Sequence, residues 1–356
     1  MKKILISTYC HWTSFGSILQ SLGFQKAIEN IGAKATTITF ASEEVVPAVK
    51  KAKIGLNRET VNYIYQSLNR KRLEQGKKRC LNFMDQHICR AIISEKENLL
   101  RELPDADAYI AGSDQIWHPA LCREDFFLSY APEVKKRISY AASMGVLSIP
   151  EQNVERFGKL LQNFDSFSVR EEEMLPIIRR YTDKTVLQHI DPTFLISADE
   201  WRQYESAYDI QEPYILVYAL YWDQALNKQL KELHGRTGYR IVSIQNSFRP
   251  IYANDVVKDA GPAEFLWLID HAEAVITSSF HGTAFSVIFN KRFYPAVNPN
   301  APSRIDSLLK MLHIHTPISL QKLLDFVPDY TKVNVRIEQE KTRSMDYLRR
   351  EINGEE

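Results

Sequence analysis

The chain has 356 residues, which is enough for two domains that each bury their own core. A formal net charge of +1 argues against nucleic acid as a partner. The four cysteines, Cys10, Cys80, Cys89 and Cys122, show no C-x-x-C spacing, so they predict free thiols in a reducing compartment and no bound metal. The first apolar run is too short for a signal peptide, and no run approaches about 18 apolar residues, so we expect a cytoplasmic protein.

Short β-branched runs alternate with amphipathic segments along the chain. In the first half we expect strands at 3–7, 35–40, 108–111, 137–141, 167–169 and 185–190, with a helix at 17–31. The pattern restarts with strands at 214–219, 240–244, 274–277 and 292–296, and with helices at 224–234, at 262–271 and from His281. This rhythm predicts an α/β protein with two doubly wound, Rossmann-like domains.

The polar segment 199–213 ends in Glu-Pro, which discourages a continuous helix, so we place the domain join there. We therefore expect a first domain over 1–205, a second over 206–330, and a C-terminal helix and tail over 331–356. Ligands of such sheets bind at the carboxyl ends of the strands. The cleft between the two domains is the expected site.

A basic segment interrupts the first domain, and we expect it to be a helical insertion over about 48–101. Its basic residues are Lys50, Lys51, Lys53, Arg58, Arg70, Lys71, Arg72, Lys77, Lys78 and Arg79. They could contact an acidic acceptor or the anionic inner face of a membrane, as a peripheral protein does. A solvated helical surface explains the same residues.

The segment from Glu273 to Lys291 predicts a strand that leads directly into a helix at Ser278-Ser-Phe-His281-Gly282. The free N–H groups and the dipole of a first helical turn favour an anion, by roughly 0.3–2 kcal/mol. His281 adds a group that can move a proton at that position. A serine N-cap followed by a histidine bonded to the backbone would produce the same pattern.

Other polar residues follow predicted strands. Asp114, Gln115 and Trp117 offer a carboxylate, an amide and an aromatic face, a mixture that suits a sugar, although a turn with a buried anchor is an alternative. Arg170 suits carboxylate or phosphate recognition, or a surface ion pair. Asp191-Pro192-Thr193 is expected to be a cap. Lys291 and Arg304 are further candidates for binding an anion.

Seven segments, in this order, resemble the polysaccharide pyruvyl transferase family over about residues 1–315. They are 112–119 (GSDQIWHP), 139–145 (SYAASMG), 168–171 (SVRE), 191–192 (DP), 261–269 (GPAEFLWLI), 278–286 (SSFHGTAFS) and 303–305 (SRI). The resemblance implies a glycosyltransferase B-like pair of domains. It also implies transfer of pyruvate from phosphoenolpyruvate onto two hydroxyls of a sugar, which forms a ketal. His281 and Arg170 take the roles of the family's donor-binding and catalytic residues.

The chain departs from the family pattern at two places. Many members carry an arginine where Ser279 stands, so Lys291 or Arg304 is expected to supply the missing cation. The N-terminal loop lacks the asparagine that members often show. That loop, with Phe15, Gly16 and Ser17, is expected to serve the acceptor together with Gln115 and Trp117.

Ketal formation needs an acid that protonates the methylene carbon, and His281 is the expected acid. Asp114 is the expected base, and Arg170, Lys291, Arg304, Ser278, Ser279 and Gly282 are expected to hold the donor. The expected role is in capsule or exopolysaccharide synthesis, on a polysaccharide or its lipid-linked precursor, with phosphoenolpyruvate as co-substrate and no other cofactor. A nucleotide-sugar-dependent glycosyltransferase of the same fold and an inactive saccharide-binding module are the alternatives.

Overall fold

The computed structural model describes residues 1–44, 58–210, 213–245, 247–296 and 304–354. The strands are β1 (Lys3–Ser7), β2 (Lys34–Phe40), β3 (Arg90–Ile93), β4 (Ala108–Ala111), β5 (Lys136–Ser139), β6 (Phe167–Val169), β7 (Val186–Gln188), β8 (Tyr214–Tyr218), β9 (Arg240–Ile244), β10 (Asp255–Val257), β11 (Ala274–Thr277) and β12 (Arg292–Pro295). The longer helices are α1 (Phe15–Asn30), α3 (Arg58–Leu68), α4 (Arg70–His87), α6 (Val154–Leu161), α9 (Gln224–Thr237), α10 (Pro262–Asp270), α11 (Phe280–Ile288), α12 (Arg304–Met311) and α13 (Tyr330–Asn353).

Shorter helical turns connect these elements. The α-helical turns are α2 (Ala41–Glu44), α5 (Leu99–Glu102), α7 (Leu175–Ile178) and α8 (Ala198–Arg202). The 3-10 turns are η1 (Lys96–Asn98), η2 (Glu124–Phe127), η3 (Glu151–Asn153), η4 (Glu172–Met174), η5 (Pro192–Phe194) and η6 (Leu320–Asp325).

Two parallel sheets form the two halves of the molecule. The first has the order β3-β2-β1-β4-β5, and parallel bridges at Ile138–Ser166 and Ala142–Val169 continue it into the β6-β7 pair. The second has the order β10-β9-β8-β11-β12. Each order reverses next to its first strand, between β1 and β4 and between β8 and β11. Two Rossmann-like halves, as the sequence predicts, are therefore confirmed.

The expected helical insertion over about 48–101 is wrong at its C-terminal end, because the last helix before β3 ends at His87. Within this segment, α3 and α4 are helical, but β3 belongs to the first sheet and pairs with β2, Thr37 opposite Arg90. Strand β10, which pairs with β9, is also absent from the strands expected from the sequence. Both strands are too short to show a recognisable alternation of apolar and polar residues. The residues 45–57 of the basic segment lie outside the described part of the chain.

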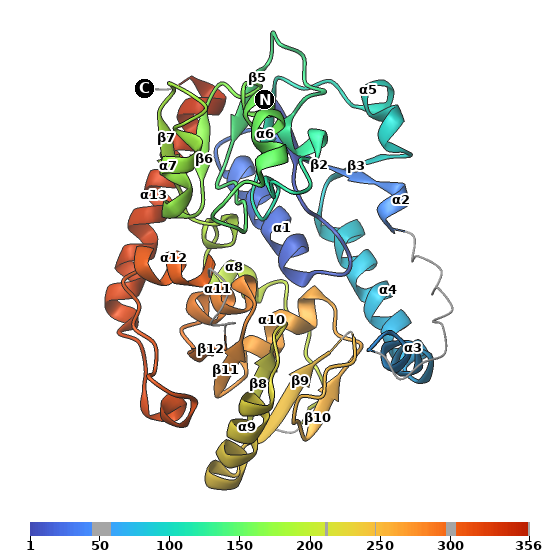
Figure 1. Ribbon diagram of the computed structural model, residues 1–356, viewed down its shortest axis with the longest axis vertical. Coiled ribbons are helices and arrows are strands. Elements are labelled where there is room, and N and C mark those ends of the chain that lie inside the picture. Colours follow the sequence, from blue (N-terminus) through green and yellow to red (C-terminus); the bar gives the residue numbers. More distant parts are fainter. Residues whose placement is uncertain (45–57, 211–212, 246, 297–303, 355–356) are drawn as a thin grey trace.

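Two helices bridge the halves on opposite sides (Figure 1). On one side α4 packs against α10, where Arg72 pairs with Asp259 at 2.8 Å and Arg79 donates to the carbonyl oxygen of Asp259. On the other side α13 follows the second half in sequence and returns to the first, where Tyr347 Oη donates to the carbonyl oxygen of Ser139. Part of the basic segment therefore joins the two halves.

A continuous apolar core passes between the halves through the start of α1. Phe15 lies 5.0 Å from Phe265 and 6.2 Å from Tyr218, measured between ring centroids. Buried side chains of α1, α10 and α11 belong to the same cluster. This packing brings the carboxyl ends of the strands in the first half against the first turn of α11 in the second.

Candidate functional site

Helix α11 begins directly after β11, at the point where the order of the second sheet reverses. Ser279 caps it by accepting from the N–H of Gly282 at 3.3 Å. Gly282 must be small, because a Cβ there would lie 2.3 Å from Oγ1 of Thr277. The predicted strand-to-helix junction is confirmed, and it places His281 in the first turn of the helix.

The imidazole of His281 lies against α1 of the other half. A Cβ on Gly16 would come within 2.2 Å of Nδ1 of His281, so only glycine allows this approach. The side chain of His281 is 7% exposed, and its Nε2 lies 3.8 Å from Oδ2 of Asp191. His281 therefore faces residues that the first half contributes.

Asp191 and Arg170, which follow β7 and β6, form the centre of the cluster. Nη1 of Arg170 donates to Oδ2 of Asp191 at 2.8 Å, and its Nε donates to Oε1 of Glu171 at 2.9 Å. Ser113 Oγ also donates to Oδ2 of Asp191, at 3.1 Å, while Oδ1 accepts from the N–H and hydroxyl of Thr193. The expected capping role of Asp191 is thus confirmed, and the same carboxylate also holds the arginine.

Asp114 and Arg304 complete the cluster. Asp114 follows β4 with a left-handed φ of 61°, and its Oδ1 accepts from Nη1 of Arg304 at 3.1 Å. Burial opposes ionisation of Asp114, but the neighbouring positive charges, those of His281 when it is protonated and of Arg304 and Arg170, outweigh it and lower the pKa of the carboxyl. Asp114 is therefore an ionised carboxylate at neutral pH.

Three buried polar atoms in this cluster have no hydrogen-bond partner among the described residues: Nε2 of His281, Nη2 of Arg170 and Oε2 of Glu171. An unpaired buried polar group costs about 1–3 kcal/mol, so native structures keep few of them. Two potential donors and one acceptor in one place match a ligand that carries both an anionic oxygen and a hydroxyl. We take this cluster as the candidate active site.

Burial and charge set the protonation states of the cluster. Burial lowers the pKa of His281, although the carboxylates of Asp191 and Asp114 favour the protonated ring. Burial also opposes the charge of Arg170, but Glu171 and Asp191 outweigh it, so the pKa of the guanidinium is raised. Without a bound anion the imidazole is neutral at pH 7 and the arginine is charged.

Lys291 is not brought to the cluster. It follows the last turn of α11, whereas His281 is in the first, and a nine-residue helix is about 13 Å long. The ammonium of Lys291 donates to the carbonyl oxygen of Asp270 at 2.6 Å. Of the two cations expected to replace the missing arginine, only Arg304 lies in the cluster.

The two serines before His281 use their hydroxyls locally. Ser278 Oγ accepts from the N–H groups of Leu220 and Tyr221, at 2.7 and 3.0 Å, and so ties the ends of β8 and β11 together. Ser279 Oγ caps α11. Both oxygens shape the junction as acceptors, and neither serine supplies the positive charge of an arginine.

Most residues expected to contact the acceptor are structural. Trp117 is fully buried and stacks on Phe127 at 5.8 Å, so the expected aromatic face for a sugar is wrong. Phe15 is in the core between the halves, and Ser17 Oγ donates to backbone carbonyls of the preceding turn. Gln115 packs against Gly145, where a Cβ would lie 2.2 Å from its Nε2.

Glu171 is a residue of the cluster for which the sequence predicts no role. It stands next to Arg170, is 5% exposed, and fixes the guanidinium through Nε. Charged residues are rarely buried unless they are paired. The adjacent Arg-Glu pair after a short apolar strand was the available signal.

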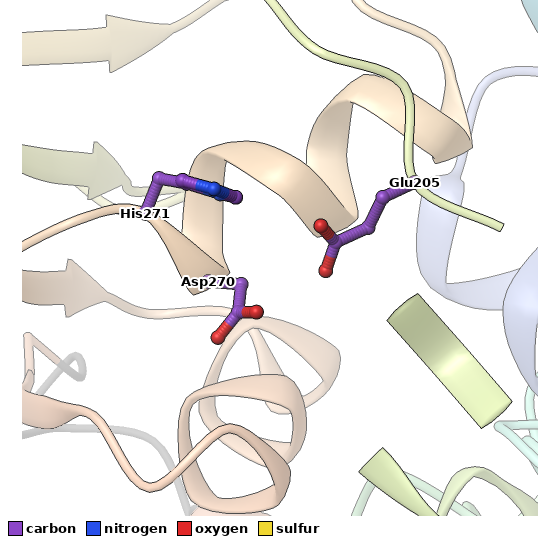
Figure 2. Close-up of side chains that lie close together, drawn as sticks. All are labelled: Glu205, Asp270 and His271. Atoms are coloured by element: carbon purple, nitrogen blue, oxygen red, sulfur yellow. The ribbon is translucent and has the colours of Figure 1, made fainter. Parts of the chain in front are cut away.

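A second group of titratable residues lies away from this cluster. Figure 2 shows Glu205, Asp270 and His271 close together, and one potential ligand atom of each lies within 4.8 Å of the others. Arg202 already donates to both carboxylate oxygens of Asp270, at 2.8 and 3.3 Å. Because a cation already pairs with Asp270, we interpret this group as structural.

Glu205 makes the stability of this group depend on pH. Burial and the neighbouring Asp270 raise its pKa from 4.5 to about 7. Between pH 4.5 and about 7 the carboxyl of Glu205 is ionised in the unfolded state and still protonated in the folded state. The free energy of unfolding therefore falls as the pH rises through this range. Glu205→Gln removes this penalty, and we expect it to stabilise the protein by about 1–3 kcal/mol at pH 8 and by little at pH 4.5.

Thermal unfolding at both pH values measures this effect, with Glu155→Gln on the exposed surface of α6 as the matched control. An equal change in Tm at the two pH values would contradict the raised pKa. Stabilisation of the wild-type protein by added Zn²⁺, lost in Glu205→Gln, would show instead that the group binds a metal.

Comparison with known proteins agrees with this geometry. The family model described as polysaccharide pyruvyl transferase matches residues 15–300, so the chain belongs to this family. No protein with a curated description matches its sequence. The description of this family supports transferase activity in polysaccharide synthesis.

Solved structures confirm the fold. The UDP-GlcNAc 2-epimerase from Neisseria meningitidis bound to UDP-GlcNAc superposes with a TM-score of 0.54 at 10% identity, covering 100% of both chains. The UDP-N-acetylglucosamine 2-epimerase from Rickettsia bellii gives a TM-score of 0.51 at 10% identity, with the same coverage. The two Rossmann-like halves are thus arranged as in the glycosyltransferase B fold.

Proposed function

We propose that the protein transfers the pyruvyl group of phosphoenolpyruvate to two hydroxyls of one sugar, forming a ketal and releasing phosphate. The observation that supports this best is the cluster of buried Arg170 and His281 with unpaired polar atoms, at the junction of the two halves in a member of this family. An arginine fixed by two carboxylates and a histidine beside it suit a small, strongly anionic donor.

Arg170 and Arg304 are the donor-binding cations in this proposal. Nη2 of Arg170 is the guanidinium nitrogen that its contacts to Glu171 and Asp191 leave unpaired, and it would donate to a phosphate or carboxylate oxygen. Arg304 lies over the same ring as Arg170, that of Phe280, at 5.9 and 3.9 Å from its centroid. Both guanidinium groups therefore lie near Phe280 in the first turn of α11, where the helix N-terminus also favours an anion.

His281 is the proposed acid. Its proton would go to the methylene carbon of phosphoenolpyruvate, which leaves a cation-like carbon that one sugar hydroxyl attacks. The lowered pKa of His281 must rise before this step, and a bound anion raises it by favouring the imidazolium. Asp191, 3.8 Å from Nε2, stabilises the same charged form.

The second half of the reaction forms the second C–O bond and breaks the bond to phosphate. Of the two hydroxyl protons, one replaces the proton that His281 delivered and the other leaves with the phosphate. Asp114 is the proposed acceptor of a hydroxyl proton, because it is ionised and lies beside His281 and Arg304. Each charge-assisted hydrogen bond to the leaving phosphate contributes roughly 1.5–3 kcal/mol.

Mass spectrometry tests this proposal directly. The purified protein is incubated with phosphoenolpyruvate and a panel of synthetic and lipid-linked glycosides, and the expected product is the acceptor plus pyruvate less water, formed with one equivalent of inorganic phosphate. Because no other cofactor is proposed, EDTA should leave the rate unchanged. Release of a nucleotide from a nucleotide sugar, with no release of phosphate from phosphoenolpyruvate, would favour the glycosyltransferase alternative. Binding of a saccharide without turnover would favour the inactive binding module.

We also propose that a lipid-linked acceptor brings the protein to an anionic membrane surface through α4. No helix in the described ranges has the length and hydrophobicity to cross a bilayer, so such contact would be peripheral. Arg72 and Arg79 are used in contacts with the second half, whereas Lys71 and Lys78 are exposed and seven residues apart, on one face of the helix.

Charge reversal of this exposed pair tests the membrane proposal. Each lysine near an anionic surface contributes about 1 kcal/mol, so Lys71→Glu with Lys78→Glu should raise KM for a lipid-linked acceptor at least about 30-fold. KM for a soluble glycoside should not change. Lys228→Glu with Lys231→Glu on α9 is the matched control. Equal effects on both acceptors, or parallel salt dependence in the wild type, would contradict the proposal.

A further inference from the structure

A pocket of about 170 Å³ adjoins the catalytic cluster. Its lining consists of Gly145, Val146, Leu147, Glu171, Glu173, Met174, Arg304 and Asp306. Two of these residues also belong to the cluster, since Glu171 holds Arg170 and Arg304 bonds Asp114. A group bound in this pocket would therefore lie next to the proposed donor site.

The walls of the pocket differ in chemistry. Val146 and Leu147 form an apolar side, and Leu147 is 48% exposed although it is a large apolar side chain. Glu173 and Asp306 are exposed carboxylates at the rim, and burial and the charge of Glu173 raise the pKa of Asp306, so the two groups are near each other. An apolar side facing several carboxylates suits the C–H face and the hydroxyls of a sugar ring.

Glu171 supplies an observation that itself points to a ligand. It is buried, it lines the pocket, and its Oε2 has no hydrogen-bond partner among the described residues. An ionised carboxylate only accepts hydrogen bonds, so a donor such as a hydroxyl would satisfy this oxygen. The same residue fixes Arg170, so a hydroxyl bound to Oε2 would be placed beside the donor-binding guanidinium.

Building on the pyruvyl transfer proposed above, we propose that this pocket binds the reacting sugar ring of the acceptor and selects an uncharged ring. The pocket is lined by three carboxylates and one guanidinium, those of Glu171, Glu173, Asp306 and Arg304. The carboxylates would repel a ring that carries a carboxylate, because like charges in a shared site are unfavourable. With a volume of about 170 Å³, the pocket suits one ring better than an oligosaccharide. Hydroxyl recognition falls to Glu171, and discrimination by charge to Glu173 and Asp306.

Charge reversal at the rim tests this proposal, because both rim residues are exposed and outside the catalytic cluster. For the wild-type protein we expect kcat/KM to be at least tenfold higher for neutral hexosides than for the corresponding hexuronides. Glu173→Lys with Asp306→Lys should lower this preference at least tenfold. Glu133→Lys, at an exposed turn before β5, is the matched control. An active double variant with an unchanged preference would overturn the proposal.

A binding measurement separates this inference from the proposed function. Saturation-transfer NMR with methyl hexosides and methyl hexuronides needs no turnover. Neutral sugars should give signals with the wild-type protein, and hexuronides should give stronger signals with the double lysine variant. If the protein binds neutral sugars in this way but never uses phosphoenolpyruvate, the proposed pyruvyl transfer is wrong, whereas the assignment of the pocket is supported. If pyruvyl transfer occurs but the lysine variant binds both sugars as the wild type does, the pocket assignment is wrong.

Discussion

Replacing His281 with glutamine should lower kcat for pyruvyl transfer by roughly 10²–10⁴-fold, the usual contribution of a general acid. Glutamine keeps a polar side chain of similar reach but cannot deliver a proton near neutral pH. The binding of phosphoenolpyruvate should change much less, because the proposed cations Arg170 and Arg304 remain in place. Quenched-flow measurement of phosphate release, with the dissociation constant from calorimetry, distinguishes the two effects.

His271 provides the matched control, since it lies beyond α10 in the group shown in Figure 2 and has no place in the proposed chemistry. His271→Gln should leave kcat unchanged. A folded His281→Gln variant with near-normal kcat would remove His281 from the mechanism, whereas a variant that loses only affinity would make it a binding residue.

The pH dependence of kcat/KM should report the same group. The free protein has a pKa for His281 below 6.5, because burial disfavours the imidazolium. The required protonated form is therefore lost as the pH rises through this lowered value, and kcat/KM should fall on that side. Asp191→Asn removes a charge that favours the imidazolium, so the falling limb should move to lower pH. If the falling limb of the Asp191→Asn variant stays at the same pH, the contact of 3.8 Å between Asp191 and His281 does not stabilise the imidazolium.

Much of the fold was predictable, because buried parallel strands and the helices between them leave long regular patterns in the sequence. The segment from Ala274 to Ile288 is an example, since an apolar strand, a serine cap and an apolar helix follow each other without a loop. Strands β3 and β10 were missed, since edge strands of three or four residues depend on pairing with a neighbour and carry no period of their own.

The site was predictable where a residue type fits few structural roles. Arg170 and His281 were identified from their places at the ends of strands, and the structure brings them together through Asp191. The sequence predicts only the capping role of Asp191, because the local motif contains only the partner that follows it in the chain, Thr193. The second carboxylate oxygen of Asp191 binds residues far apart in the sequence, and only the folded chain brings these together.

Aromatic residues were the least predictable. Trp117 follows Asp114 by three positions, and the sequence alone cannot tell whether the turn between them directs the ring outward or inward. The ring is buried against Phe127 and Phe164. Burying a large aromatic ring stabilises the fold by about 1.5–3 kcal/mol, so an apolar cluster nearby competes strongly with a ligand for it.

Arg170→Lys should weaken transition-state stabilisation by about 2–4 kcal/mol, which lowers kcat/KM for phosphoenolpyruvate roughly 30- to 1,000-fold. Lysine keeps the charge that Asp191 and Glu171 require, so these carboxylates are not left unpaired. Its single ammonium cannot reproduce the planar guanidinium, which bonds both carboxylates and still presents Nη2. We therefore expect kcat/KM for phosphoenolpyruvate to fall, whereas KM for the acceptor should not change.

Arg202→Lys is the matched control, since Arg202 also bonds carboxylates, those of Asp199 and Asp270, but away from the cluster. Both variants should lose some stability in denaturant titrations, and only Arg170→Lys should lose affinity for phosphoenolpyruvate in calorimetry. Because the ion pair of Arg170 is buried and that of Arg202 is partly exposed, the stability loss should also be larger for Arg170. Unchanged affinity together with unchanged kcat/KM in a folded Arg170→Lys variant would mean that the arginine only joins Asp191 to Glu171, and the donor-binding cation would have to be Arg304.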